Sequence, residues 1–111
     1  MLSIKKNSRF RAIYASADSK ADRYLVMYHT ENGGDFSRLG ITVSGKIGNA
    51  VTRNRIRRRI REIVRLSEGS FLSGYDIVVV ARKPSAEADY RVLERSVMKL
   101  ASACGLLKEG V

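Results

Sequence analysis

The sequence of 111 residues has one cysteine, one proline and one histidine, and this scarcity excludes several classes of protein. Because Cys104 stands alone, the chain cannot form an internal disulfide, and a reducing compartment such as the cytoplasm is expected. Because Pro84 is the only proline, no Pro-rich linker is present. His29 is predicted to be an ordinary surface residue. The 11 acids are scattered, without the pairing that acid–base catalysis or a metal cluster requires, so we predict no catalytic residue and no bound metal.

Long hydrophobic runs are also absent. The longest uninterrupted apolar run, Ile77 to Ala81, is far too short to cross a bilayer. The N-terminal lysines are not followed by the apolar segment of a secretory signal, so no membrane partner is expected. The apolar share of 44% suffices for one modest core, which predicts a single domain over residues 1–111.

Acidic residues are outnumbered, and the excess of positive charge is unevenly distributed. The net charge is +10, and the segments 1–23, 24–45, 46–65 and 66–111 carry +4, −1, +7 and 0. Such clustering in a small domain is typical of a protein that binds a polyanion. The alternative is a solvated face that only keeps the protein soluble, but solubility does not require the charge to be clustered.

The remaining pattern predicts an α+β sandwich with helices against a small mixed sheet. The expected elements are a helix over 8–17 capped by Ser8, strands over 23–30, 38–44 and 75–83, an arginine-rich helix between the last two, and a final helix capped by Ser85 and stopped by Gly105. The Asn-Gly pair within 31–35 predicts a hairpin that pairs the first two strands. The continuous apolar run in 75–83 favours a central strand that is buried on both faces. Cys104 falls on the apolar stripe of the last helix and is interpreted as a core residue.

The segment 45–65, "GKIGNAVTRNRIRRRIREIVR", holds seven arginines and one acid. At helical spacing it has an apolar stripe of Ile56, Ile60, Ile63 and Val64, which is expected to pack on the sheet, and Asn49 is a credible N-cap. The outer face is almost entirely arginine, and like charges at i, i+4 cost roughly 0.2–0.5 kcal/mol each. Arginine binds phosphate through two parallel hydrogen bonds and stacks on bases, so a nucleic-acid backbone is the expected partner. A membrane-surface helix is disfavoured because the apolar side is short and lacks Trp and Phe.

Aromatic residues recur on two elements. Phe10 and Tyr14 share a helix face, and Tyr24, Val26 and Tyr28 share a strand face. These side chains either form ordinary core or line a cleft in which single-stranded bases stack, and spacing alone favours the core. Charge does not distinguish RNA from DNA, and no zinc-finger, helix-turn-helix or RNP-type motif is present.

Residues 46–62, "KIGNAVTRNRIRRRIRE", resemble the signature of the bacterial ribonuclease P protein subunit. The signature is a Gly-Asn-Ala-Val run followed by Arg-Asn-Arg and further basic residues. The resemblance extends through "LVMY", "LGITVS" and "DIVVVARKP" over nearly the whole chain. Gly45 departs from the family, which often has lysine there.

The resemblance implies a fold and a function. The implied fold is like ribosomal protein S5 domain 2, in the order α-β-β-β-α-β-α with a short first strand and a left-handed βαβ crossover. The implied function is that of the protein part of a ribonucleoprotein that removes the 5′ leader from precursor tRNA. The family's catalyst is its RNA subunit with bound Mg²⁺, and its partners are ribonuclease P RNA and precursor tRNA rather than a small molecule.

Two sets of contact residues follow from the resemblance. Those expected to bind the catalytic RNA are Lys46, Arg53, Asn54, Arg55, Arg57, Arg58, Arg61 and Arg65. Those expected to bind the leader are Phe10, Tyr14, Val26, Tyr28, Arg57 and Arg61. The alternative function is a general RNA-binding or ribosomal-type protein without a role in cleavage, and an independent protein nuclease is disfavoured by the scattered acids.

Overall fold

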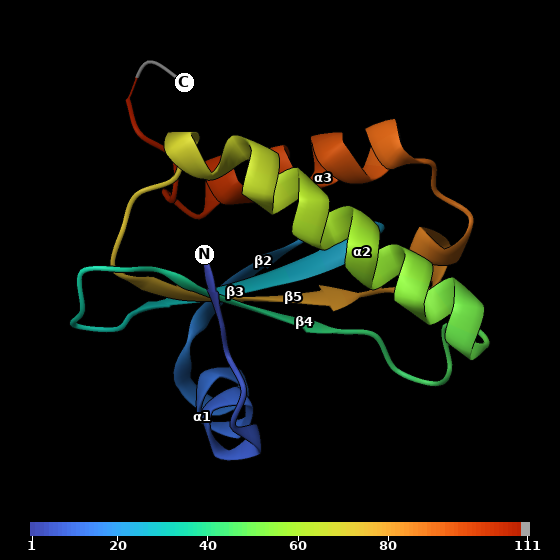
Figure 1. Ribbon diagram of the computed structural model, residues 1–111, viewed down its shortest axis with the longest axis horizontal. Helices are drawn as coiled ribbons and strands as arrows, with labels where there is room; N and C mark the ends of the chain where they lie inside the picture. Colours follow the sequence, from blue (N-terminus) through green and yellow to red (C-terminus); the bar gives the residue numbers. More distant parts are fainter. Residues whose placement is uncertain (110–111) are drawn as a thin grey trace.

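The computed structural model describes residues 1–109, which form a five-stranded mixed sheet with helices on both faces (Figure 1). The order of the strands in the sheet is β1-β4-β5-β3-β2. Helix α1 covers one face, and α2 and α3 lie side by side on the other (Figure 1). The elements are β1 (Leu2–Ser3), α1 (Asn7–Ser16), β2 (Asp18–Ala21), β3 (Leu25–Glu31), β4 (Arg38–Thr42), α2 (Ala50–Ser67), β5 (Tyr75–Ala81) and α3 (Tyr90–Ala103), with 3-10 turns at Glu68–Ser70 and Lys83–Ala86. The predicted α+β class and element order are confirmed, with β1 as an additional strand.

Strand β5 is the centre of the sheet, as its continuous apolar run predicts. It pairs in parallel with β4 and antiparallel with β3. Val78 packs against Ile4 and Ile13 under α1, whereas Ile77 and Val79 belong to the larger core beneath α2 and α3. Apolar side chains on both faces are therefore buried, because each face is covered by helix.

The predicted hairpin between the first two strands is wrong. β3 and β4 each pair with β5, which lies between them. The turn chemistry is real, since Gly33 has a φ of 73° and the Asn32 side chain accepts from the N–H of Gly34 at 2.8 Å. A turn sequence predicts only that the chain reverses direction. It does not predict which strand pairs with β3. Here β5 pairs with β3, because its apolar side chains are buried at the centre of the sheet by contacts far apart in the sequence.

The β4–α2–β5 connection is left-handed. In Figure 1 both strands run from left to right, β1 and β4 lie nearer the viewer than β5, and α2 returns above them from right to left. From β4 through α2 to β5 the chain therefore turns counterclockwise as it moves away from the viewer, and such a path is left-handed. Connections of this kind are right-handed in about 98% of cases, so here the family resemblance, not general geometry, predicted the hand.

Two predicted helix caps are wrong. Lys6 stands at the N-cap of α1 and supplies no side-chain hydrogen bond, while Ser8 lies inside the helix. Helix α3 begins after Asp89, whose side chain accepts from the N–H of Val92 at 2.9 Å. Ser85 is instead buried in the preceding 3-10 turn, where its hydroxyl donates to the carbonyl of Arg82 at 2.6 Å. Both serines have the right chemistry for a cap, but Ser8 lies within α1 and the hydroxyl of Ser85 is bound in the preceding turn.

The predicted apolar stripes are confirmed. All four stripe residues of α2 are buried against the sheet, as are Leu93, Val97, Leu100 and Ala101 of α3. Cys104 is half-buried at the end of α3, and burial raises the pKa of its thiol. Gly105 follows with a φ of 72°, the left-handed conformation that ends a helix. No helix among residues 1–109 is long and apolar enough to cross a membrane.

Candidate RNA interface

Helix α2 carries the arginine face, and its geometry follows from its own sequence. Asn49 caps the helix by accepting from the N–H of Thr52 at 2.9 Å, as predicted. With the isoleucine stripe packed on the sheet, the opposite side of the helix faces solvent. The predicted contacts that are exposed are Asn54, Arg58, Arg61 and Arg65 on the helix and Lys46 in the segment before it. This outer face is a cationic surface, and among residues 1–109 the only ion pair it makes within 4 Å is that of Arg65 with Glu62 at 3.5 Å.

Arginines on the flank of α2 are held by the protein itself. Arg55 donates from Nη2 to the carbonyl of Ala86, and Arg59 donates from Nη1 to the carbonyl of Ala88, each at 3.1 Å. These contacts tie α2 to the segment that leads into α3. The Nε atoms of Arg53 and Arg55 are buried without a hydrogen-bond partner in the described chain. Helical spacing alone does not separate such anchored arginines from exposed ones.

Arg57 lies at the other edge of α2 and points toward the end of β4. Its guanidinium donates to the Asn54 side chain at 3.2 Å and to the carbonyl of Val43 at 3.3 Å. From there it reaches a groove between α1 and β4. Arg57 therefore connects the arginine face to this groove.

The α1–β4 groove, as we name it, is lined by aromatic, polar and cationic side chains. Phe10 and Tyr14 lie on the α1 side with their ring centroids 6.3 Å apart. The Tyr14 hydroxyl forms a 2.6 Å hydrogen bond with the hydroxyl of Thr42, and Tyr14 as a whole residue is 38% exposed. The lining residues are Asn7, Phe10, Arg11, Tyr14, Ile41, Thr42, Val43 and Arg57. Exposed ring faces beside guanidinium groups are what a single-stranded nucleic acid requires.

The structure brings together most, but not all, of the predicted leader residues. Tyr28 meets Tyr14 edge to face, with ring centroids 5.2 Å apart and planes at 66°. Val26 is half-buried on β3 and does not line the groove, and Arg61 lies on the outer face of α2. Asn7 and Arg11 were missed, although they share the helical face of Phe10 and Tyr14 at spacings of three and four. That spacing could have identified them.

The Phe10 ring lies over Gly40 in the middle of β4. A Cβ atom at Gly40 would come within 2.6 Å of Cε1 and 2.7 Å of Cζ of that ring. The missing side chain is what allows the ring to lie against the strand. Gly40 thereby sets the depth of the groove floor.

We expect Gly40→Ala to push the Phe10 ring outward and to lower the free energy of unfolding by about 1 kcal/mol, a small overpacking cost because the ring can swing away. Urea denaturation and the NMR shifts of the Phe10 ring measure the two effects. Gly45→Ala is the matched control, because no atom of the described residues outside its chain neighbours lies within 4 Å of a Cβ at Gly45. Unchanged Phe10 shifts in Gly40→Ala would contradict this role.

Asp76, in β5, fastens α1 and β4 together. It is fully buried and accepts from Arg38 at 2.8 and 2.6 Å, from Arg9 at 2.7 Å and from Asn32 at 3.0 Å. Burial alone would raise the pKa of Asp76, but these hydrogen bonds outweigh it and lower the pKa to about 2. The carboxylate is therefore ionised at neutral pH, and it holds both guanidinium groups in place.

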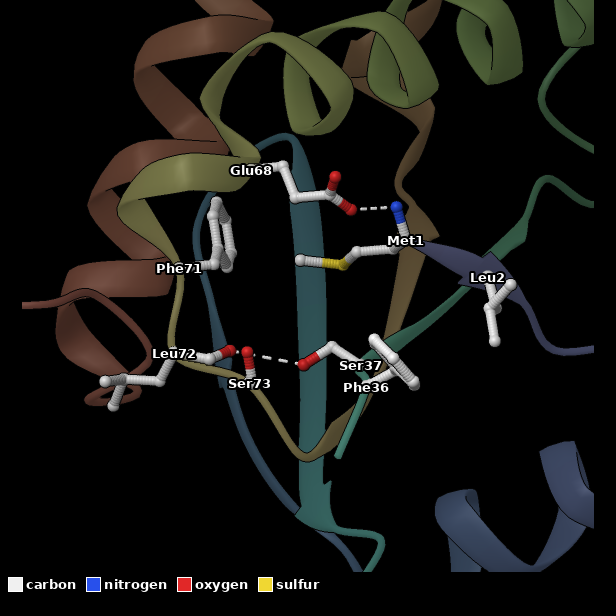
Figure 2. Close-up of a pocket in the computed structure, with 8 residues that line it drawn as sticks. All are labelled: Met1, Leu2, Phe36, Ser37, Glu68, Phe71, Leu72 and Ser73. Atoms are coloured by element: carbon white, nitrogen blue, oxygen red, sulfur yellow. Dashed lines mark hydrogen bonds and ion pairs between the residues drawn. The ribbon is translucent and has the colours of Figure 1, made fainter. Parts of the chain in front are cut away.

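A different pocket, shown in Figure 2, is unsuited to RNA. It lies where β1, the β3–β4 loop and the segment after α2 meet, and it is lined by Met1, Leu2, Phe36, Ser37, Glu68, Phe71, Leu72 and Ser73. Within the described part of the chain, Glu68 is the only charged side chain in this lining, and it pairs with the amino group of Met1. A lining without a cationic side chain offers no counter-charge to phosphate.

Ionisable groups elsewhere form no metal centre. Among residues 1–109, no three His, Cys, Asp or Glu side chains are placed to hold a metal ion. His29 is half-buried in β3, opposite Asp18 of β2.

Comparisons with known proteins agree on one family. The family model described as Ribonuclease P matches residues 2–105. The "Ribonuclease P protein component" of Natranaerobius thermophilus is 36% identical over 111 residues, covering 100% of this chain and 96% of the relative. That of Clostridioides difficile is 45% identical over 98 residues, covering 87% and 86%.

Solved structures give the same result. The RNase P protein of Staphylococcus aureus superposes with a TM-score of 0.90 at 37% identity, covering 97% of this chain and 99% of the other. That of Thermotoga maritima superposes with a TM-score of 0.83 at 34% identity, covering 90% and 94%. The likeness therefore spans the sheet, all three helices and the groove.

Proposed function

This chain belongs to the ribonuclease P protein family, and on that basis we propose that its α1–β4 groove binds the single-stranded 5′ leader of precursor tRNA. Members of the family are the protein subunit of the ribonucleoprotein that matures tRNA 5′ ends, with ribonuclease P RNA as their partner and the catalyst. The protein's task is then to position substrate on that RNA. Leader binding performs this task because only the precursor carries a leader.

One observation carries the proposal, namely that Arg57 lines the groove from the edge of α2, next to the arginine face. Stacking of a base on an aromatic side chain contributes about 1–3 kcal/mol and tolerates any base, which suits leaders of differing sequence. Phe10 and Tyr14 supply the rings, and Tyr28 packs against Tyr14 edge to face. Arg11 and Arg57 flank them and can neutralise the phosphates between stacked bases.

The ribonuclease P RNA is assigned to the outer face of α2 and the residues before it. The exposed members of the predicted set, Lys46, Asn54, Arg58, Arg61 and Arg65, are the best placed for phosphate contacts. Arg53 and Arg55 are assigned two roles, packing within the protein and binding the catalytic RNA. The Nε atom of each is buried without a partner among residues 1–109, and the guanidinium of Arg55 donates to the carbonyl of Ala86. Of the two residues predicted to serve both RNAs, Arg57 keeps that assignment, and Arg61 is assigned mainly to the catalytic RNA.

Mg²⁺ is assigned to the RNA subunit, where it would activate the water that attacks the scissile phosphate. This chain contributes positive charge, because a domain of net charge +10 reduces repulsion between the two RNAs as they meet.

We place this single RNA-binding domain, residues 1–111, in the bacterial cytoplasm.

Reconstitution tests the proposal. The chain is combined with bacterial ribonuclease P RNA, and binding of precursor and mature tRNA is measured with and without the protein at low Mg²⁺. We expect the protein to tighten precursor binding by at least about fivefold, the value of one stacked base, and to leave mature tRNA nearly unchanged. Equal tightening of both tRNAs would contradict leader binding and favour a general RNA-binding role, and cleavage by the protein alone would contradict RNA catalysis.

The arginine face makes a second prediction, on salt dependence. The logarithm of the affinity for ribonuclease P RNA falls with the logarithm of salt by roughly 0.7–0.9 per phosphate neutralised. Replacing Arg57 and Arg61 together with alanine should flatten this slope by about 1.5 in a salt titration. Arg95→Ala on α3 removes an exposed charge from another surface and should leave the slope unchanged. An unaltered slope in the double variant would place the RNA elsewhere.

A further inference from the structure

A second groove lies on the other side of α1, and the function proposed above does not use it. It is formed by the β1–α1 connection, the adjoining face of α1 and the first residue of β4. The side chains that matter are those of Ser3, Lys5, Lys6, Ser8, Arg9 and Arg38. We name it the β1–α1 groove. Among residues 1–109, no acidic side chain lines it.

The charge of this groove is built into the fold. Asp76 lies beneath it and binds both arginines, which leaves that cluster a net charge of +1, and Lys5 and Lys6 raise the total to +3. Because the carboxylate occupies Nε of Arg9 and both Nε and Nη2 of Arg38, the two guanidinium groups have fixed orientations. Each guanidinium keeps further N–H donors, since arginine has five. Their side chains are 34% and 39% exposed, so those donors are accessible.

The linings of the two grooves adjoin at the start of α1. Asn7 lines the α1–β4 groove and its neighbour Ser8 lines the β1–α1 groove, with the exposed Lys5 and Lys6 leading into the second. Residues of α1 line both grooves, and α1 and α2 lie on opposite sides of the sheet (Figure 1). A strand leaving the aromatic groove along α1 therefore meets these lysines rather than the surface assigned to the catalytic RNA.

We propose that the β1–α1 groove binds the upstream part of the precursor tRNA leader, beyond the bases that stack on Phe10 and Tyr14. This proposal rests on the leader binding proposed above and extends it. Lys5, Lys6 and the exposed donors of Arg9 and Arg38 bind phosphates of the single strand, without reading its sequence. The first groove then recognises that a leader is present, and the second makes affinity depend on its length.

Leader length provides the test. Precursor tRNAs with leaders of about 5 and about 12 nucleotides, within the span that small single-strand-binding folds cover, are bound to the reconstituted holoenzyme with Ca²⁺ replacing Mg²⁺ to suppress cleavage. We expect the unaltered protein to bind the long leader more tightly. The variant K5A/K6A should lose about threefold to tenfold in affinity for the long leader and less than about twofold for the short one. Its salt slope should fall by about 1.4 with the long leader only, at about 0.7 per single-strand phosphate.

Each other outcome has a definite meaning. The control K20A/K108A removes two exposed lysines from other surfaces and should match the unaltered protein with both leaders. Equal losses for K5A/K6A with both leaders, or weakened binding to ribonuclease P RNA alone, would overturn the proposal in favour of a contact with the catalytic RNA. No loss with either leader would overturn it in favour of a solvated surface. If the unaltered protein fails to distinguish precursor from mature tRNA, the leader-binding function itself fails, and that result does not depend on Lys5 or Lys6.

Discussion

Asp76→Ala is expected to lower the free energy of unfolding by about 3 kcal/mol. Removing one partner of a buried ion pair typically costs 3–5 kcal/mol, because the other charge is left without compensation. The lower end applies here, since Arg9 and Arg38 are each about one-third exposed and can be hydrated. The loss also detaches α1 from β4, because Arg9 belongs to the one and Arg38 to the other.

Urea denaturation followed by circular dichroism measures the change. Asp35→Ala removes an exposed acid from the nearby β3–β4 loop and should change the free energy of unfolding by less than about 0.5 kcal/mol. A loss below about 1 kcal/mol in Asp76→Ala would show that the buried carboxylate is not the fastening between α1 and the sheet.

The same carboxylate makes stability depend on acid pH. Its pKa in the folded protein is about 2, against an ordinary value of 3.8, so the ionised form favours folding. The stabilisation is complete above the unfolded pKa and is lost as the pH falls through 3.8 toward 2, a total of about 2 kcal/mol. Asp76→Asn, which keeps the shape but cannot ionise, should flatten the fall in stability between pH 5 and 2. If the free energy of unfolding falls as steeply between pH 5 and 2 in this variant, the pH dependence belongs to other carboxylates. One of these is Asp22, whose pKa is also lowered.

Tyr14→Ala is expected to weaken precursor tRNA binding by about fivefold to 150-fold while sparing mature tRNA. This range corresponds to the stacking of one base, about 1–3 kcal/mol. Tyr14 is the clearest test because its ring is exposed, so truncation removes little core. Phe10→Ala should act in the same direction, with an added loss of stability because that ring is partly buried beside Ile13.

The hydroxyl of Tyr14 requires its own control. Tyr14→Phe keeps the ring and removes the hydrogen bond to Thr42, so precursor binding should change by less than about threefold if stacking dominates. Competition binding with precursor and mature tRNA on the reconstituted holoenzyme gives the ratio directly. Equal losses for both tRNAs in Tyr14→Ala would argue against a leader groove.

Local sequence patterns predicted the features of a helix that depend only on its own residues. The cap at Asn49, the buried stripe of α2 and the stop at Gly105 were all predicted correctly, because each depends on residues within a few positions along the helix. The start of α3 was placed too early. Ser85 and Asp89 are both competent caps, and only the burial of Ser85 in a separate turn excludes it.

The sequence by itself determined the basic composition, the amphipathic arginine helix, the central apolar strand and, through the Gly-Asn-Ala-Val and Arg-Asn-Arg motif, the family. Only the tertiary structure placed β5 between β3 and β4, separated the arginines anchored to Ala86 and Ala88 from the exposed ones, and brought Arg57 beside Tyr14. It also assigned Asp76 to the two arginines that border the second groove. The physical reason is sequence distance, because these contacts join residues 29 to 67 positions apart, and no periodicity along the chain encodes them.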